Sequence, residues 1–279
     1  FLGTPLMVFF NFQSATLRAL GDSRTPLFFL AGASLLNVVL DILFITVFDM
    51  GVGGAAWATN TAIFASALTC LLLVTRRLPE LRLRLNDWRP RPRMALRQLW
   101  IAVPMGLQFS VTGLGAMMLQ AAINTFGVAQ MAGMTAARNV ENVACQLPVA
   151  LGQAMATYSA QNYGAGRLGR IRAGVRASVL ITVVSSIVMT VVALLFGDLF
   201  VAAFLRERTP EILAVGRHML WVTAPFFVPL GLIFIFRNTL QGIGRSLLPM
   251  LAGFVEMVMR MGVALGLLHV LGVNAVYWG

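Results

Sequence analysis

Charged side chains are scarce in this chain of 279 residues, and every basic one is an arginine. Only 11% of the residues are charged, whereas 58% are hydrophobic and the mean hydropathy is +0.83. So few polar side chains cannot cover the surface of a water-soluble domain of this length, and the composition therefore predicts an integral membrane protein. In such a protein the net charge of +11 reports topology, and no nucleic-acid partner is expected.

The chain has only two cysteines and two histidines, and it lacks the residue sets of common enzymes. Cys70 and Cys145 lie in apolar runs without metal-ligand spacing, so we expect them to be packing residues. A GxGxxG match at 164–169 follows a membrane-length apolar segment instead of a strand, which argues against a dinucleotide site. We therefore expect no enzyme, no cofactor and no dedicated metal centre.

Long apolar runs predict an all-α integral membrane fold, because a bilayer requires about 20 such residues per helix. The complete spans that we expect are 26–48, 52–74, 100–126, 131–159 with an interruption at Pro148, 177–205, 219–236 and 248–271. Partial spans lie at both ends of the chain. Since the chain begins inside an apolar stretch and stops soon after a helix start, we expect a fragment that is incomplete at both ends.

An internal repeat relates two distant parts of the chain. Residues 17–26 match residues 240–249 at Leu, Gly, Ser and Pro, and a Gly-Val turn follows each copy. Arginine is concentrated on alternate loops: 18–24, 76–97, 167–176 and 237–245 hold 16, whereas the opposite loops hold only Arg206, Arg208 and Arg217. The repeat copies thus point the same way across the membrane, with their arginine-rich loops in the cytoplasm.

A parallel repeat of this kind is typical of transporters built from two similar halves. We therefore predict a two-lobed polytopic helical transporter. Residues 1–75 are assigned to one lobe, residues 76–97 to a cytoplasmic linker, and residues 98–279 to a second lobe.

Five ionisable residues inside the expected spans are candidates for a functional role, because a charged side chain there costs roughly 2.5 to 3.5 kcal/mol on insertion scales. They are Asp41, Arg138, Glu141, Glu256 and Arg260. Arg138 and Glu141 are three residues apart, and Glu256 and Arg260 are four apart, so each couple shares a helix face. Two interpretations stay open: internal ion pairs that hold helices together, or a polar cavity wall that contacts a substrate.

Asp41 differs from the other four because no basic residue lies one helical turn away. Asn37 is on the same face, and the matching place in the other repeat copy holds no acid. Burial without a counter-charge favours the protonated or cation-bound form of a carboxyl group. Asp41 is therefore a candidate for exchanging H+ or Na+, and the alternative is an Asp that only packs against a neighbouring helix.

Five motifs are spread over the whole chain. They are Leu17-Arg-Ala-Leu-Gly-Asp22, Asn37-Val-Val-Leu-Asp41, Gly51-Val-Gly-Gly-Ala-Ala-Trp-Ala-Thr59, Gln161-Asn-Tyr-Gly-Ala-Gly166 and Phe236-Arg-Asn-Thr-Leu-Gln-Gly-Ile-Gly244. Together they resemble the multidrug and toxic compound extrusion (MATE) family of cation-coupled antiporters. That family has twelve helices in two six-helix lobes, and this chain is similar to the part from the end of helix 4 to the start of helix 12.

The resemblance also implies a cation-coupling site. By motif, Asn37 and Asp41 would be its helix 5 groups and Thr59 its helix 6 hydroxyl, with an acid on helix 1 that lies outside this chain. Ser14 stands where the family often has an Asn on helix 4, and Gln108 stands where some members have an acid on helix 7. We treat Gln108, Arg138, Glu141, Glu256 and Arg260 as candidates for the substrate cavity.

The implied activity is export of amphipathic, often cationic, drugs in exchange for H+ or Na+ by alternating access. The protein is expected to be a monomer in the inner or plasma membrane of a prokaryote, surrounded by lipid. The leading alternative is a lipid-linked sugar flippase, whose anionic cargo requires a strongly basic cavity. A membrane receptor or membrane-embedded enzyme is the third alternative, and neither a ligand domain nor a catalytic set supports it.

Overall fold

The computed structural model describes residues 3–77, 91–124, 127–205 and 209–266. All regular structure in these ranges is helical, and five helical segments within them are long and apolar enough to cross a membrane. These observations confirm the all-α membrane fold expected from the sequence. Contacts within the chain divide it into unit 1, Phe1–Arg91, and unit 2, Pro92–Gly279, which are described separately.

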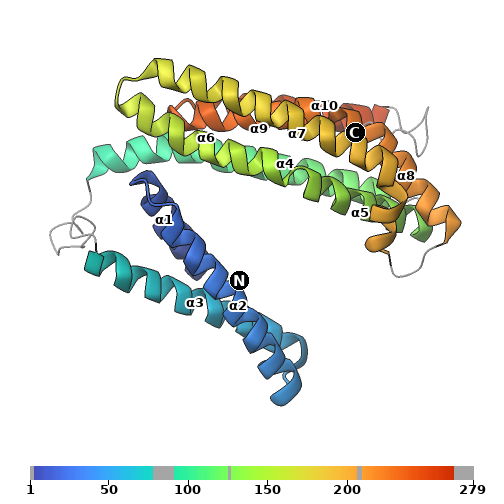
Figure 1. Ribbon diagram of the computed structural model, residues 1–279, viewed down its shortest axis with the longest axis horizontal. Coiled ribbons are helices and arrows are strands. Elements are labelled where there is room, and N and C mark those ends of the chain that lie inside the picture. The colour runs from blue at the N-terminus through green and yellow to red at the C-terminus, as the bar shows by residue number, and fades with distance from the viewer. Residues whose placement is uncertain (1–2, 78–90, 125–126, 206–208, 267–279) are drawn as a thin grey trace. The chain divides into compact units, whose positions relative to one another are not determined.

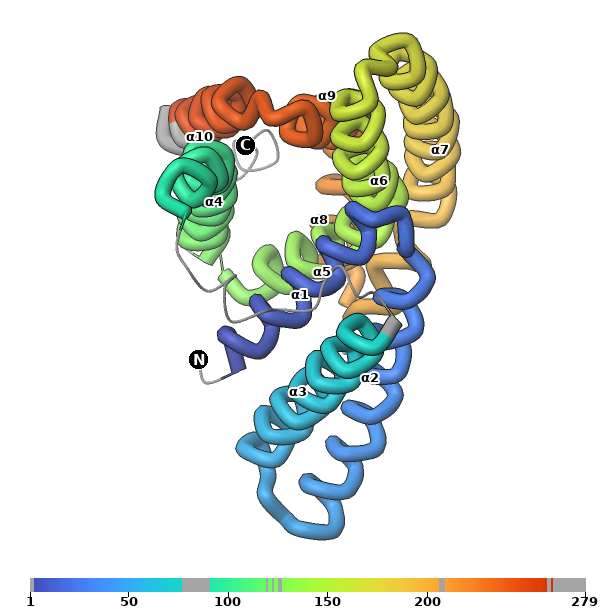
Figure 2. Tube along the Cα trace, turned by 90° about the vertical axis from the view of Figure 1, so that its left-hand side faces the viewer, coloured from blue at the N-terminus to red at the C-terminus, as the bar shows by residue number. Residues whose placement is uncertain are grey.

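The described residues of unit 1 form three α-helices, α1 (Thr4–Ala19), α2 (Arg24–Ile42) and α3 (Gly51–Arg77), and a π-helical turn, η1 (Leu43–Val47), at the end of α2. Figure 2 shows α2 and α3 side by side as an antiparallel hairpin. Asp22 stabilises the start of α2, because its Oδ1 accepts hydrogen bonds from the backbone N–H groups of Arg24 and Thr25 at 3.1 and 3.0 Å. Each helix of the hairpin is long enough to span a bilayer.

Unit 2 contains seven α-helices within its described residues. They are α4 (Pro92–Ile123), α5 (Val128–Ala144), α6 (Gln146–Gly164), α7 (Leu168–Ala203), α8 (Pro210–Thr223), α9 (Phe227–Gly242) and α10 (Leu247–Gly266), with a 3-10 turn, η4 (Ala224–Phe226), between α8 and α9. Figure 1 shows these helices as a layered bundle, in which α6 packs mainly on α9, α4 on α10, and α5 on α8. At Gly242 a Cβ atom would lie 2.3 Å from the carbonyl oxygen of Ala156, so glycine permits direct backbone contact between α9 and α6.

The internal repeat is visible in the turns that join helices. After α1, the N–H of Asp22 donates to the carbonyl of Leu17 across Gly21, whose φ is +93°. After α9, the N–H of Arg245 donates to the carbonyl of Leu240 across Gly244, whose φ is +80°. Both are glycine-dependent helix ends of the Schellman type. The repeated motif therefore encodes the same helix stop and the same entry into the next helix.

Several element boundaries differ from those expected. The interruption of span 131–159 falls at Cys145 instead of Pro148, because a proline ring clashes with the carbonyl four residues earlier, here Ala144. Residues 210–217, expected in a loop, belong to α8, and Arg237, also expected in a loop, lies inside α9. Helical structure enters both ends of the expected linker 76–97, since α3 continues to Arg77 and α4 begins at Pro92. The middle of that linker lies outside the described residues.

Candidate functional site

The first candidate site lies between α2 and α3 in unit 1. Asn37 Nδ2 donates to Thr59 Oγ1 at 3.3 Å, and the Thr59 hydroxyl donates to the carbonyl of Ala55 at 3.0 Å. The Thr59 oxygen thus links the Asn37 amide to the α3 backbone. This contact spans two helices, so the structure brings together two of the residues that the motifs assign to a coupling site.

Asp41 lies one turn beyond Asn37 on α2. Its Oδ1 is buried, and no hydrogen-bond donor reaches that atom within the described part of the chain. The π-helical turn Leu43–Val47 begins two residues later, and such turns are frequent at functional sites. Leaving a buried acceptor without a donor costs roughly 1–3 kcal/mol, and more when the group is charged. This oxygen is therefore a buried acceptor whose partner is not among the described residues.

Ser14 is buried in α1 but lies at a different level along the helix axes from Asn37 and Thr59. At one end of α1, Gly3 contacts Asn60, and at the other end Leu17 packs with Cys70 and Val74. Ser14 is therefore level with about residue 69 of α3, roughly 15 Å along the helix from Thr59 at 1.5 Å per residue. The structure brings Asn37 and Thr59 into contact, with Asp41 one turn away, and places Ser14 elsewhere.

The end of α1 also buries a residue that the sequence analysis did not single out. Gln13 is buried, and neither of its amide atoms has a hydrogen-bond partner in the described residues; the same holds for the Ser14 hydroxyl. A glutamine at the end of an apolar run carries no local signal of burial, since it can equally face a loop. Only the packing of α1 on α3 reveals it.

The second candidate site is a polar cluster where α4, α9 and α10 meet in unit 2. Gln108 is only 2% exposed, and its Oε1 accepts from Gln241 Nε2 at 3.0 Å. Turning the Gln108 amide by 180° places its oxygen 3.2 Å from Nε and 3.3 Å from Nη1 of Arg237. Arg237 Nη2 in turn forms an ion pair with Glu256 Oε2 at 2.9 Å.

This cluster changes the expected role of Glu256. The sequence spacing predicts a pair with Arg260 on the same helix, whereas the structure gives Glu256 a partner on α9, Arg237. The side chains of Arg237 and Glu256 are 14% and 28% exposed, so the pair is largely shielded from water. The side chain of Arg260 lies outside the described part of the structure, and its pairing stays a prediction.

Arg138 and Glu141 contact two different neighbours of α5. Arg138 Nη1 donates to Gln120 Oε1 of α4 at 3.1 Å, and the Glu141 carboxylate accepts a hydrogen bond from the Thr223 hydroxyl at the end of α8. Arg138 therefore connects α5 to α4, and Glu141 connects α5 to α8. Gln120 and Thr223 have no spacing signal in the sequence, because their partners are 18 and 82 residues away.

Membrane helices that carry an internal repeat and buried polar groups are typical of membrane transporters. A family model, MatE, matches residues 104–265, which is more than half of the chain. The chain therefore belongs to the MatE family, the multidrug and toxic compound extrusion transporters that its motifs resemble.

Curated relatives agree with this assignment. The chain is 32% identical over 249 residues to the "Probable multidrug resistance protein YpnP" of Bacillus subtilis, covering 88% of this chain and 55% of that protein. It is 24% identical over 269 residues to the "FAD transporter" of Shewanella oneidensis, covering 94% of this chain and 58% of that protein. The chain thus spans little more than half the length of these relatives.

Solved structures establish the fold independently. A MOP superfamily transporter from Pyrococcus furiosus, described by a "reverse polarity of binding pocket", matches with a TM-score of 0.90 at 21% identity, covering 99% of this chain and 62% of that one. The crystal structure of MATE in the bent conformation matches with a TM-score of 0.89 at 22% identity, with the same coverage. At these identities the likeness concerns the fold alone.

Proposed function

We propose that the full-length protein exports amphipathic, often cationic, drug-like compounds in exchange for H+ or Na+ by alternating access. In this proposal unit 1 is the end of the N-terminal lobe and unit 2 is most of the C-terminal lobe. The protein acts as a monomer in the inner membrane of a prokaryote. The observation that carries the proposal is the buried Asp41 Oδ1, which has no donor among the described residues and lies one turn from the Asn37–Thr59 contact.

Asp41 would couple the ion to the transport cycle through its charge. A proton on Asp41, or Na+ beside it, would offset the cost of burying Oδ1 without a donor among the described residues. The Thr59 hydroxyl oxygen and the Asn37 amide oxygen are hard donors of the kind that alkali cations prefer. If only one transporter conformation shields this site, cation binding there shifts the population towards that conformation.

The polar cluster in unit 2 supplies candidate substrate contacts. Glu256, partly exposed beside Arg237, and the amides of Gln108 and Gln241 are the candidates in this cluster for contact with a cationic, amphipathic ligand. The pair of Arg138 and Glu141 and the position of Arg260 complete the candidate set. The relatives named as probable multidrug resistance proteins support a drug-like substrate.

A lipid-linked sugar flippase is less well supported. Its anionic cargo requires basic side chains that are free to bind it, whereas Arg237 holds Glu256 at 2.9 Å and Arg138 lies three residues from Glu141. The described cluster is therefore close to neutral overall, which suits an amphipathic cation better than a pyrophosphate.

Ion-gradient-driven drug transport by the full-length protein in proteoliposomes tests the proposal. Asp41→Asn keeps the side-chain shape and removes the exchangeable charge, so we expect drug binding to persist and driven transport to fall at least about tenfold. Asp49→Asn is the matched control, because Asp49 is an exposed acid in the turn between η1 and α3. Wild-type transport rates from Asp41→Asn would show that the carboxylate is structural and that coupling lies elsewhere.

A further inference from the structure

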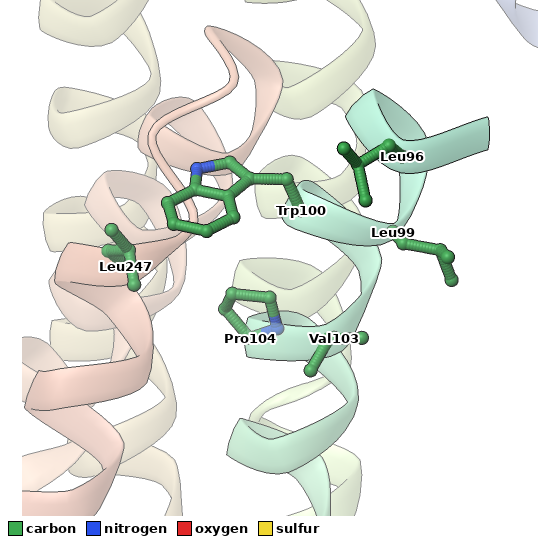
Figure 3. A pocket seen from close by; sticks show the side chains of 6 residues that line it. All are labelled: Leu96, Leu99, Trp100, Val103, Pro104 and Leu247. Carbon is green, nitrogen blue, oxygen red and sulfur yellow. The ribbon is translucent and has the colours of Figure 1, made fainter. Parts of the chain in front are cut away.

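An apolar pocket lies between the N-terminal third of α4 and the start of α10. Figure 3 shows its lining side chains, five from α4 and one from α10: Leu96, Leu99, Trp100, Val103, Pro104 and Leu247. The pocket has a volume of about 260 Å³, and its walls are aliphatic and aromatic side chains. A site of this kind suits an alkyl chain better than a polar solute.

The two helices that form the pocket begin at the same side of unit 2. A Cβ atom on Gly244, just before α10, would lie 3.9 Å from Ile101 of α4, and one on Gly253 would lie 3.0 Å from the Cγ atom of Gln108. The α10 side of these contacts runs from Gly244 to Gly253 while the α4 side runs from Ile101 to Gln108, so α4 and α10 run parallel. The N-terminus of α10, with its partial positive charge, therefore lies beside the pocket, and the start of α4 lies roughly 13 Å further in the same direction.

Basic side chains continue the pocket wall towards these helix starts. Arg93 and Arg97 precede Trp100 by seven and three residues and Pro104 by eleven and seven, so the four share one face of α4. Arg245 precedes Leu247 by two residues at the start of α10. All three arginines are exposed. The apolar pocket thus has a basic rim on the side where both helices begin.

No acidic residue occurs in the two segments that form the pocket and its rim, 91–110 and 240–255. The next acid on α10 is Glu256, nine residues after Leu247 and roughly 13 Å further along the helix. Glu256 is also held by Arg237 at 2.9 Å. The local charge at the rim is therefore positive, which complements an anionic group.

We propose that this pocket binds an anionic phospholipid. One acyl chain lies against Trp100 and Leu247, and the phosphate is held by Arg93, Arg97 and Arg245. Guanidinium groups bind phosphate with two parallel hydrogen bonds, and basic clusters at the ends of membrane helices attract anionic headgroups. Trp100 is 69% exposed, as expected for an aromatic ring at the membrane–water interface. The proposal does not depend on which compound is transported.

Trp100 provides its own readout of lipid binding. We would prepare the full-length protein with every other tryptophan replaced by Phe and measure fluorescence quenching by lipids with brominated acyl chains. The two probes are phosphatidylglycerol, which is anionic, and phosphatidylcholine, which is zwitterionic. We expect phosphatidylglycerol to bind beside Trp100 with clear preference, by about fivefold for each arginine that contributes.

Substitutions separate the headgroup contact from the apolar contact. Arg93→Gln with Arg97→Gln should remove most of the preference for phosphatidylglycerol, while Leu247→Phe should weaken the binding of both lipids by narrowing the pocket. The matched control is Arg170→Gln with Arg172→Gln, because these arginines are exposed near the start of α7 and do not line the pocket. The control should leave the preference unchanged.

Three results would overturn the proposal. Equal quenching by both lipids would mean that Trp100 meets only bulk lipid. Loss of preference in the α7 control would mean that overall charge, not this site, attracts the headgroup. Absence of quenching by either lipid would mean that another segment of the protein, or a second copy, covers the pocket.

Discussion

Asp41 in unit 1 and Glu256 in unit 2 are both acids inside membrane helices, but the partners of their carboxylate oxygens differ. Asp41 Oδ1 is buried without a donor among the described residues, whereas Glu256 has an arginine at 2.9 Å on the adjacent helix. The helix ends that precede the two regions nevertheless share the same turn, with Leu17 matching Leu240 and Gly21 matching Gly244. The repeat therefore preserves backbone geometry while the polar side chains have different roles.

Because of this difference, we expect the coupling ion, H+ or Na+, to act at Asp41 and not at Glu256. An acid held by an arginine suits a structural role that joins helices, while a buried acceptor without a donor among the described residues suits the binding of an incoming ion. Four predictions test the comparison between the two units, ordered from the largest expected effect on stability to the smallest. Each is measured as the free energy of unfolding of the full-length protein in mild detergent.

The largest effect is expected for Arg237→Met. It removes the Arg237 guanidinium from the partly buried Glu256 carboxylate, which should lower the free energy of unfolding by about 3 kcal/mol. The exchanged variant Arg237→Glu with Glu256→Arg should recover part of this loss. Arg217→Met is the control, since Arg217 and its partner Asp198 are 56% and 55% exposed, and such pairs contribute about 0–1 kcal/mol. Equal losses from Arg237→Met and Arg217→Met would remove the distinction between the two pairs.

The shared turns should respond equally to a side chain. Gly21→Ala and Gly244→Ala each force alanine into a left-handed conformation, so both should lower the free energy of unfolding by about 1–2 kcal/mol. Gly32→Ala is the control, because Gly32 lies inside α2 with open space around it, and alanine favours a helix by about 1 kcal/mol. A large loss at one turn and none at the other would contradict the structural repeat.

Thr59→Val should have a smaller effect. It removes the acceptor of the Asn37 amide and is expected to lower the free energy of unfolding by about 1 kcal/mol. Thr69→Val is the matched control, since the Thr69 hydroxyl donates to the carbonyl of Ala65 within its own helix. If the proposed coupling site is correct, Thr59→Val also raises the ion concentration that half-saturates transport, and Thr69→Val does not.

The smallest loss is expected for Asp41→Asn. Because Asp41 Oδ1 has no donor in the described residues, replacing the carboxylate by an amide should leave the free energy of unfolding unchanged or raise it by about 1 kcal/mol. Glu256→Gln is the comparison and should be clearly destabilising, since it removes the counter-charge of Arg237. A loss at Asp41 as large as that at Glu256 would reveal a structural partner for Asp41.

Local features of the fold follow directly from the sequence. Apolar run lengths predict the membrane helices, and the recurring Gly21 and Gly244 motifs predict the helix stops, because both depend on neighbouring residues. The motif match of Asn37 and Thr59 also identifies two groups that do touch. The helix boundaries near Pro148 and Pro210 are less well predicted, since a proline affects the preceding turn and the surrounding packing decides which residue breaks the helix.

The sequence by itself determined the membrane class, the family and the isolated acid at Asp41, because composition, motifs and one-turn spacing are properties of the chain alone. Tertiary structure decided the partner of Glu256, the depth of Ser14 and the burial of Gln13. It also assembled the pocket beside Trp100 from α4 and α10. These features depend on which helices meet and in which register, and a charge 19 residues away becomes a neighbour at 2.9 Å only when α9 packs beside α10.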